Sequence, residues 1–71
     1  MENWTKIFTS NKEHLIAMAK QMLEGEGFES QSFNQKDSTY LFGYIYLYVK
    51  NEDAAACKPL IEQFKKDLEI E

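Results

Sequence analysis

The stretch Tyr44-Ile45-Tyr46-Leu47-Tyr48-Val49 decides the fold of this chain. Tyrosine and aliphatic side chains alternate at every position of residues 44–49. This period of two predicts a β-strand, because successive side chains of a strand point to opposite faces of the sheet. One face of the strand is then aliphatic and suited to a core, whereas the other face carries three tyrosines.

Two further strands are predicted from composition. Residues 4–9 are rich in aromatic and β-branched side chains, which favour strands. Strict alternation places Trp4 and Phe8 on one face and Ile7 on the other, and we expect Ile7 to share the inner face, so that Trp4 and Phe8 join the tyrosines. Residues 28–33 are apolar only at their two ends, which suits a strand at the edge of the sheet.

A first helix is predicted after the first strand. Ser10 and Glu13 have the spacing of a capping box, in which Ser10 caps the helix and Glu13 bonds back to the cap. Apolar residues follow at helical spacing on one face, namely Leu15, Ile16, Ala19, Met22 and Leu23. Gly25 or Gly27 can supply the left-handed residue that ends the helix.

A second helix is predicted from Asn51, whose side chain is suited to cap it. Its apolar residues also fall on one face, namely Cys57, Leu60, Ile61, Phe64 and Leu68. Pro59 lies within this pattern, where it removes one hydrogen bond and clashes one turn back at a cost of about 3 kcal/mol. We therefore expect a kink near Ala55 or a helix that restarts at Pro59.

The order of these elements predicts the fold class. The length of 71 residues allows a single α+β domain over residues 1–71. The βαββα order predicts a ferredoxin-like (split βαβ) sandwich, a three-stranded antiparallel sheet with two helices on one face and the third strand beside the first. A full domain of this type has a fourth strand paired with the first. Residues 69–71 are too short to form it, so the outer edge of the first strand is expected to be open.

Composition excludes several classes of partner and cofactor. The net charge is −4, and all eight cationic residues are lysines. Nucleic-acid-binding domains are usually basic and use arginine for phosphates and base edges, so no nucleic-acid partner is expected. A bilayer span needs about 20 apolar residues, which are not present, so no membrane association is expected. The first ten residues contain no signal-peptide pattern, and the single Cys57 suits a reducing compartment, so the cytoplasm is expected.

No chemistry-bearing constellation is recognisable. His14 and Cys57 are too few for a structural zinc site, which takes four ligands, so no metal is expected. We expect His14 on the surface of the first helix and Cys57 in the core as a small apolar residue. The chain has no carboxylate pair, nucleophile constellation or cofactor fingerprint. It is therefore expected not to be an enzyme and to need no cofactor.

An aromatic sheet face is the first candidate interaction site. Its candidate residues are Trp4, Phe8, Tyr44, Tyr46 and Tyr48. Tyrosine and tryptophan are enriched in protein interfaces, and we expect a homo-oligomer formed by this face. The alternative is ordinary cross-strand pairing that stabilises the sheet by about 0.2–1 kcal/mol per pair.

A polar segment is the second candidate site. Residues 34–38 are predicted to form a turn or loop, and the candidate binding residues are Asn34, Lys36, Asp37, Ser38, Thr39 and Tyr40. Binding groups often lie on loops. The alternative is a simple hairpin connection in which Asp37 and Ser38 bond the backbone.

Three segments also resemble a known family. They are NWTKIFT (residues 3–9), NQKDSTY (34–40) and FGYIYLYV (42–49). In order and spacing they are similar to the small bacterial family of putative prokaryotic signal-transducing proteins. The resemblance implies a ferredoxin-like fold related to nitrogen-regulatory PII proteins and a bacterial cytoplasmic setting. The chain has no glycine-rich phosphate loop and no arginine, so nucleotide binding of the PII type is not carried over.

Two functional hypotheses follow. The first is a non-enzymatic regulatory or signal-transducing domain that self-associates through the aromatic face or the open strand edge. It would bind a partner protein or a small ligand through residues 34–40. The alternative is a monomeric sensor of a small ligand that uses the aromatic sheet face as its binding platform.

Overall fold

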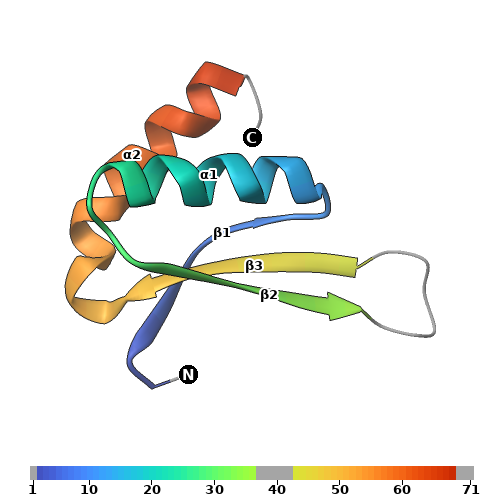
Figure 1. Ribbon diagram of the computed structural model, residues 1–71, viewed down its shortest axis with the longest axis horizontal. Helices are drawn as coiled ribbons and strands as arrows, with labels where there is room; N and C mark the ends of the chain where they lie inside the picture. The colour runs from blue at the N-terminus through green and yellow to red at the C-terminus, as the bar shows by residue number, and fades with distance from the viewer. Residues whose placement is uncertain (1, 37–42, 69–71) are drawn as a thin grey trace.

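The structure is a computed structural model that describes residues 2–36 and 43–68. Its elements are β1 (Trp4–Ser10), α1 (Glu13–Gly25), β2 (Ser30–Lys36), β3 (Gly43–Lys50) and α2 (Asn51–Leu68). Within the described residues the strands form one antiparallel sheet in the order β1-β3-β2. Both helices lie on the same side of this sheet (Figure 1). The predicted α+β class and βαββα arrangement are confirmed, and they are consistent with a ferredoxin-like fold.

Strand β3 is the central strand of the sheet. It pairs with β1 along one edge and with β2 along the other. Its aliphatic face forms the middle of the core, because Ile45, Leu47 and Val49 are 8%, 0% and 0% exposed. Tyr44 and the two alternate tyrosines after it point to the opposite side, as the period of two predicts.

Strand β1 contains a β-bulge that changes which side chains enter the core. Lys6 lies opposite Tyr48, but Phe8 lies opposite Leu47, so Ile7 is the extra residue. Phe8 is therefore on the helix side, where it is 5% exposed and contacts Phe64 edge-to-face at 5.7 Å between ring centroids. The prediction that Phe8 joins the aromatic face is wrong, because strict alternation does not allow for an inserted residue.

Strand β2 begins and ends later than its sequence predicts. It runs to Lys36, which lies opposite Gly43, in continuous register with β3. The predicted strand over residues 28–33 is displaced: Phe28 precedes the strand and packs partly buried against the core. The predicted loop is wrong for Asn34 and Lys36, which are strand residues, because pairing with the long β3 outweighs the weak strand preference of Asn and Lys.

Helix α1 has the predicted apolar face but a different start. Leu15, Ile16, Ala19 and Leu23 are buried and Met22 is partly buried, as predicted. The predicted capping box is wrong, because Lys12 is the N-cap residue and no side chain caps the helix. Ser10 instead belongs to β1, and its hydroxyl accepts a hydrogen bond of 3.0 Å from the Lys12 N–H. That short local bond turns the chain before the helix begins.

The end of α1 is a Schellman motif. The N–H of Phe28 donates to the carbonyl of Leu23 at 2.9 Å, and the N–H of Gly27 donates to the carbonyl of Glu24 at 3.0 Å. Gly27 has a φ of 91°, in the left-handed region that glycine adopts without steric cost. The prediction that Gly25 or Gly27 ends the helix is confirmed at Gly27.

Helix α2 begins directly after β3 and is tied to the N-terminal segment. The Asn51 side chain accepts a hydrogen bond from the Thr5 hydroxyl and donates one of 2.9 Å to the Glu2 carbonyl. The Asn51 backbone N–H also donates to the Asn3 carbonyl at 2.9 Å. Asn51 was predicted to cap its own helix. Its side-chain bonds instead join the start of α2 to residues far away in the sequence.

The predicted apolar face of α2 is confirmed. Cys57 and Ile61 are buried, and the partly buried Leu60, Phe64 and Leu68 pack against the core. The helix continues through Pro59, so the predicted restart at Pro59 is wrong. Pro59 and Ala55 are both exposed. The Ala55 carbonyl, which loses its helical donor at Pro59, can therefore bond to water.

The two glycines at the end of α1 are expected to respond in opposite directions to substitution by alanine. An added Cβ meets no atom within 4 Å at Gly25 or at Gly27, so backbone conformation alone decides the result. Gly27→Ala should lower the free energy of unfolding by about 1–2 kcal/mol, because alanine is strained in the left-handed region. Gly25→Ala should raise it by up to about 1 kcal/mol. Urea unfolding of the two variants measures both values, and equal effects would contradict the assigned cap.

Replacement of Pro59 should stabilise the protein. Pro59→Ala restores the N–H donor to Ala55 within an exposed part of α2. The free energy of unfolding is expected to rise by about 1–3 kcal/mol. Thermal and urea unfolding of the variant measure the change, with Ala56→Ser on the exposed face of α2 as a nearby control. A loss of stability would mean that the core packing of α2 depends on the proline geometry.

Candidate functional site

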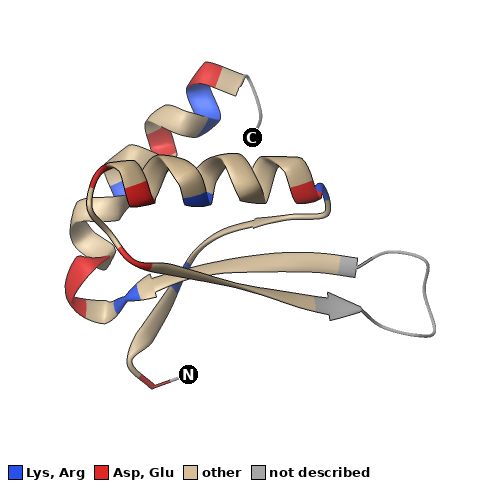
Figure 2. Ribbon diagram, in the orientation of Figure 1, with Lys and Arg blue, Asp and Glu red and all other residues tan. Residues whose placement is uncertain are grey.

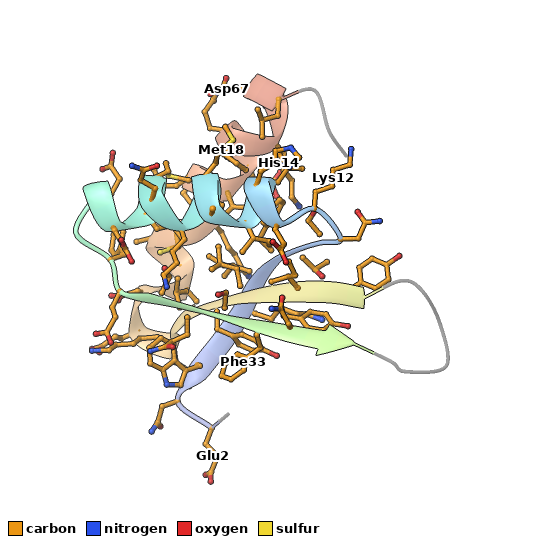
Figure 3. All side chains as sticks on the ribbon, turned by 45° about the vertical axis from the view of Figure 1, so that its right-hand side comes forward. Glu2, Lys12, His14, Met18, Phe33 and Asp67 are labelled. Carbon is orange, nitrogen blue, oxygen red and sulfur yellow. The ribbon has the colours of Figure 1, made fainter. Side chains whose placement is uncertain are left out.

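The side of the sheet away from the helices carries a group of aromatic residues. We call this group the aromatic face, and its members are Trp4, Phe33, Tyr44, Tyr46 and Tyr48. The register sets this arrangement, because directly opposite residues of an antiparallel pair share one side of the sheet. Tyr46 lies opposite Phe33 on β2 and opposite Thr9 on β1. Figure 3 shows Phe33 on the side of the sheet opposite the helices.

The aromatic rings contact one another and a lysine. Phe33 and Tyr48 meet edge-to-face, with 5.6 Å between centroids and 87° between ring planes. The ammonium group of Lys6 lies 5.0 Å from the centroid of the Tyr46 ring, within range of a cation–π interaction. Phe33 and Tyr44 nevertheless remain 44% and 51% exposed. Contacts between side chains of neighbouring strands therefore cover only part of the aromatic face, and considerable aromatic surface is left exposed to solvent.

The aromatic face carries no negative charge. None of the residues of β1, β2 or β3 is acidic, although the chain has twelve acidic residues. In the described part of the chain the acidic residues lie on helices, turns and the start of the chain, as Figure 2 shows. At the border of the sheet the Nζ atom of Lys50 forms an ion pair with Oε1 of Glu29, 3.2 Å away. The hydrogen bond and the charge of Glu29 raise the pKa of Lys50.

The structure places most, but not all, of the predicted face residues together. Trp4 and the three tyrosines share one side of the sheet, whereas Phe8 is in the core. Phe33 belongs to the face and was not among the candidates. The alternation of Gln31, Phe33 and Gln35 with small polar residues could have indicated it, since these three residues lie opposite tyrosines of β3.

The loop candidate is divided by the end of β2. Asn34 and Lys36 are strand residues that lie opposite Ile45 and Gly43. Asp37, Ser38, Thr39 and Tyr40 lie outside the described residues. The proposed binding role of residues 34–40 therefore stays a prediction.

Two hollows border the sheet. A cavity of ≈ 470 Å³ runs along the outer edge of β1 and is lined by residues 6–12 together with Leu15, Tyr44 and Lys65. A second, of ≈ 440 Å³, lies beside Trp4 and is lined also by Asn3, Lys50, Asn51 and Glu52. The first hollow is mixed in character, since it combines three ammonium groups with apolar and hydroxyl side chains. It offers contacts along a strand edge rather than an enclosed ligand chamber.

The remaining reactive side chains lie apart from one another. His14 is exposed on α1 and points away from the sheet (Figure 3). Cys57 is a free thiol in the core, and burial raises its pKa, which keeps it protonated and unreactive. Ser30 is also buried, and its hydroxyl has no hydrogen-bond partner among the residues that the structure describes. The described residues contain no group of three or more potential metal ligands.

Residues 4–65 match the family described as "Putative prokaryotic signal transducing protein". The chain belongs to this family. The matched range contains the whole aromatic face and the lining of the β1-edge cavity. No curated protein and no solved structure matches the chain. In the described part of the chain, no helix is long and apolar enough to cross a membrane.

The contact between Phe33 and Tyr48 should be measurable as a coupling energy. In a double-mutant cycle with Phe33→Ala and Tyr48→Ala, the coupling is expected to be about 0.5–1.5 kcal/mol, as for edge-to-face aromatic pairs. Urea unfolding of the wild type, both single variants and the double variant measures it. A parallel cycle of Phe33 with Tyr44, whose rings are not in contact, is the control. Equal coupling in both cycles would contradict a specific Phe33–Tyr48 contact.

Proposed function

We propose that the chain is a small, non-enzymatic signal-transducing domain that acts through protein contact and joins a second copy of itself through the aromatic face. The description of its family supports a signal-transducing role. The observation that carries the proposal is the uncovered sheet face with Trp4, Phe33 and three tyrosines on a side where the described residues provide no second layer. The proposed setting is the bacterial cytoplasm.

Side-chain chemistry supports a protein partner for this face. Tyrosine, tryptophan and phenylalanine are enriched at protein interfaces, where they bury much area at a small entropy cost. Phe33 and Tyr44 are among the most exposed large hydrophobic residues in the described part of the chain. Gln31, which lies opposite Tyr48, can add polar contacts at the rim of an interface.

The distribution of charge makes the aromatic face the surface through which two copies can best meet. The chain has a net charge of −4, so two copies repel each other over most of their surfaces. The aromatic face has no carboxylate, and a twofold contact brings this face against itself. A nucleic acid would require several free cations. Beside this face, Lys50 is paired with Glu29, and the ammonium group of Lys6 lies over the Tyr46 ring.

A charge placed at the centre of the face should dissociate the proposed dimer. Tyr46→Lys adds a cation beside Lys6, and in a twofold contact it meets the same cation of the other copy or a desolvated aromatic surface. The dimer dissociation constant should rise about thirtyfold or more, the effect of losing a contact worth about 2 kcal/mol. Sedimentation velocity over a range of protein concentrations measures it.

Two further variants make this test specific. Met18→Lys adds the same charge at an exposed position on α1 and should leave the dimer unchanged. Phe33→Lys alters an exposed residue of the face, so it should weaken the dimer without unfolding the monomer. A wild-type protein that stays monomeric at all concentrations contradicts the proposal. A monomer that carries a discrete added mass in native mass spectrometry favours the small-ligand sensor instead.

A further inference from the structure

The outer edge of β1 is an open strand edge with a cavity beside it. Within the described residues β1 pairs only with β3, so the backbone donors and acceptors on its other edge have no strand partner. The cavity of ≈ 470 Å³ follows this edge over residues 6–12. Five of the seven residues of β1 line it.

The cavity is basic, although the chain is acidic, and we call it the basic groove. Among the described residues, Lys6, Lys12 and Lys65 line it, and no carboxylate does. The ammonium of Lys6 lies on the outer side of the sheet, 5.0 Å from the Tyr46 ring centroid. The ammonium of Lys65 lies on the helix side, 5.9 Å from the Phe8 ring centroid. The strand edge therefore has positive charge on both sides of the sheet.

The helix side of the cavity also offers apolar contacts. Phe8 and Leu15 line it while belonging to the hydrophobic core. A strand added along β1 would point alternate side chains to the two sides of the sheet. Apolar side chains on the helix side would contact Phe8 and Leu15, and acidic side chains on the other side would lie close to Lys6. Lys12 and Lys65 would attract the net negative charge of the segment. An alternating sequence of acidic and apolar residues fits both requirements.

We propose that the edge of β1 binds an extended acidic segment of a partner protein, which adds to the sheet as a further strand. Strand addition provides affinity through backbone hydrogen bonds and specificity through alternate side chains. A complete ferredoxin-like domain has a fourth strand in this position, so the added segment completes the layer. This site shares Tyr44 with the aromatic face, but strand addition along β1 does not require self-association.

The same features disfavour pairing between the β1 edges of two copies. Two such edges would bring Lys6 and Lys12 of one copy close to the lysines of the other, and like charges across a strand pair are destabilising. An acidic partner removes the charge repulsion, so the lysines select against a second copy and in favour of such a segment.

A short capped peptide of alternating glutamate and valine is the probe for this site. Titration into isotope-labelled full-length protein should shift the backbone NMR signals of residues 6–12 and slow amide hydrogen exchange in β1. The same peptide with lysine in place of glutamate should not bind. Affinity should fall with added salt, because exposed charges beyond about 10 Å are screened at 0.1 M ionic strength.

Matched variants distinguish an effect of the lysines in the groove from an effect of the net charge of the protein. Lys12→Gln with Lys65→Gln removes two groove cations and should weaken binding by about tenfold, a usual size for the loss of two charge contacts. Lys20→Gln with Lys58→Gln changes the net charge equally outside the groove and should have little effect. Neither pair includes a residue of the aromatic face, so sedimentation of both should match the wild type whether or not self-association occurs.

Several outcomes would overturn the proposal. They are equal affinity for the lysine peptide, equal loss of affinity in both double variants, and signal shifts centred on Phe33 and Tyr48. Binding without slower amide exchange in β1 would mean a diffuse charge contact and not an added strand. Failure of the glutamate peptide to bind at all would also reject the site, and it would leave the proposed self-association untouched.

Discussion

The two-sided pairing of β3 is the constraint on which the rest of the structure depends. Because it is hydrogen-bonded along both edges, β3 cannot rotate or slip without breaking two ladders. Its aliphatic side chains are therefore held toward the helices, where Leu47 and Val49 are fully buried. The tyrosines are held toward the other side by the same alternation. The alternation along β3 therefore produces both the centre of the core and the aromatic face.

The bulge in β1 separates the roles of neighbouring residues. Before the bulge, Lys6 lies on the outer side and its ammonium lies over Tyr46. After it, Phe8 enters the core against Phe64. If the strand alternated regularly through Ile7, Phe8 would lie on the side of Lys6, and the core would lose the buried Phe8 ring. One residue therefore improves the core and makes the strand edge irregular.

The parts of the fold that depend on local patterns could be predicted from the sequence. The alternation of residues 44–49, the apolar faces of both helices and the left-handed glycine at position 27 each depend on a single element. The position of Phe8 could not be predicted, because a bulge is defined only by the register with a partner strand. The extent of β2 was missed for a related reason, since its polar residues become a strand by pairing with β3.

Side-chain hydrogen bonds to residues far away in the sequence also could not be predicted from local patterns. Asn51 has the sequence context of a helix cap, but its side chain bonds to Thr5 and to the Glu2 carbonyl. No local pattern distinguishes the two uses. For the candidate site, the tyrosines followed from alternation, whereas Phe33 required the correct register of β2. The basic groove was hidden because its lysines come from separate parts of the sequence, β1, the turn before α1 and α2.

Lys6 connects the two proposed surfaces. Its side chain lines the groove at the β1 edge, and its ammonium also contacts Tyr46 at the centre of the aromatic face. Under the two proposals, an acidic side chain in the groove would compete with Tyr46 for this cation. Strand addition at the edge would then change the charge beside the aromatic face. Such coupling is reciprocal, so self-association through the face would change the affinity of the groove by the same factor. The two proposals together would let a domain of this size couple two surfaces without a change of fold.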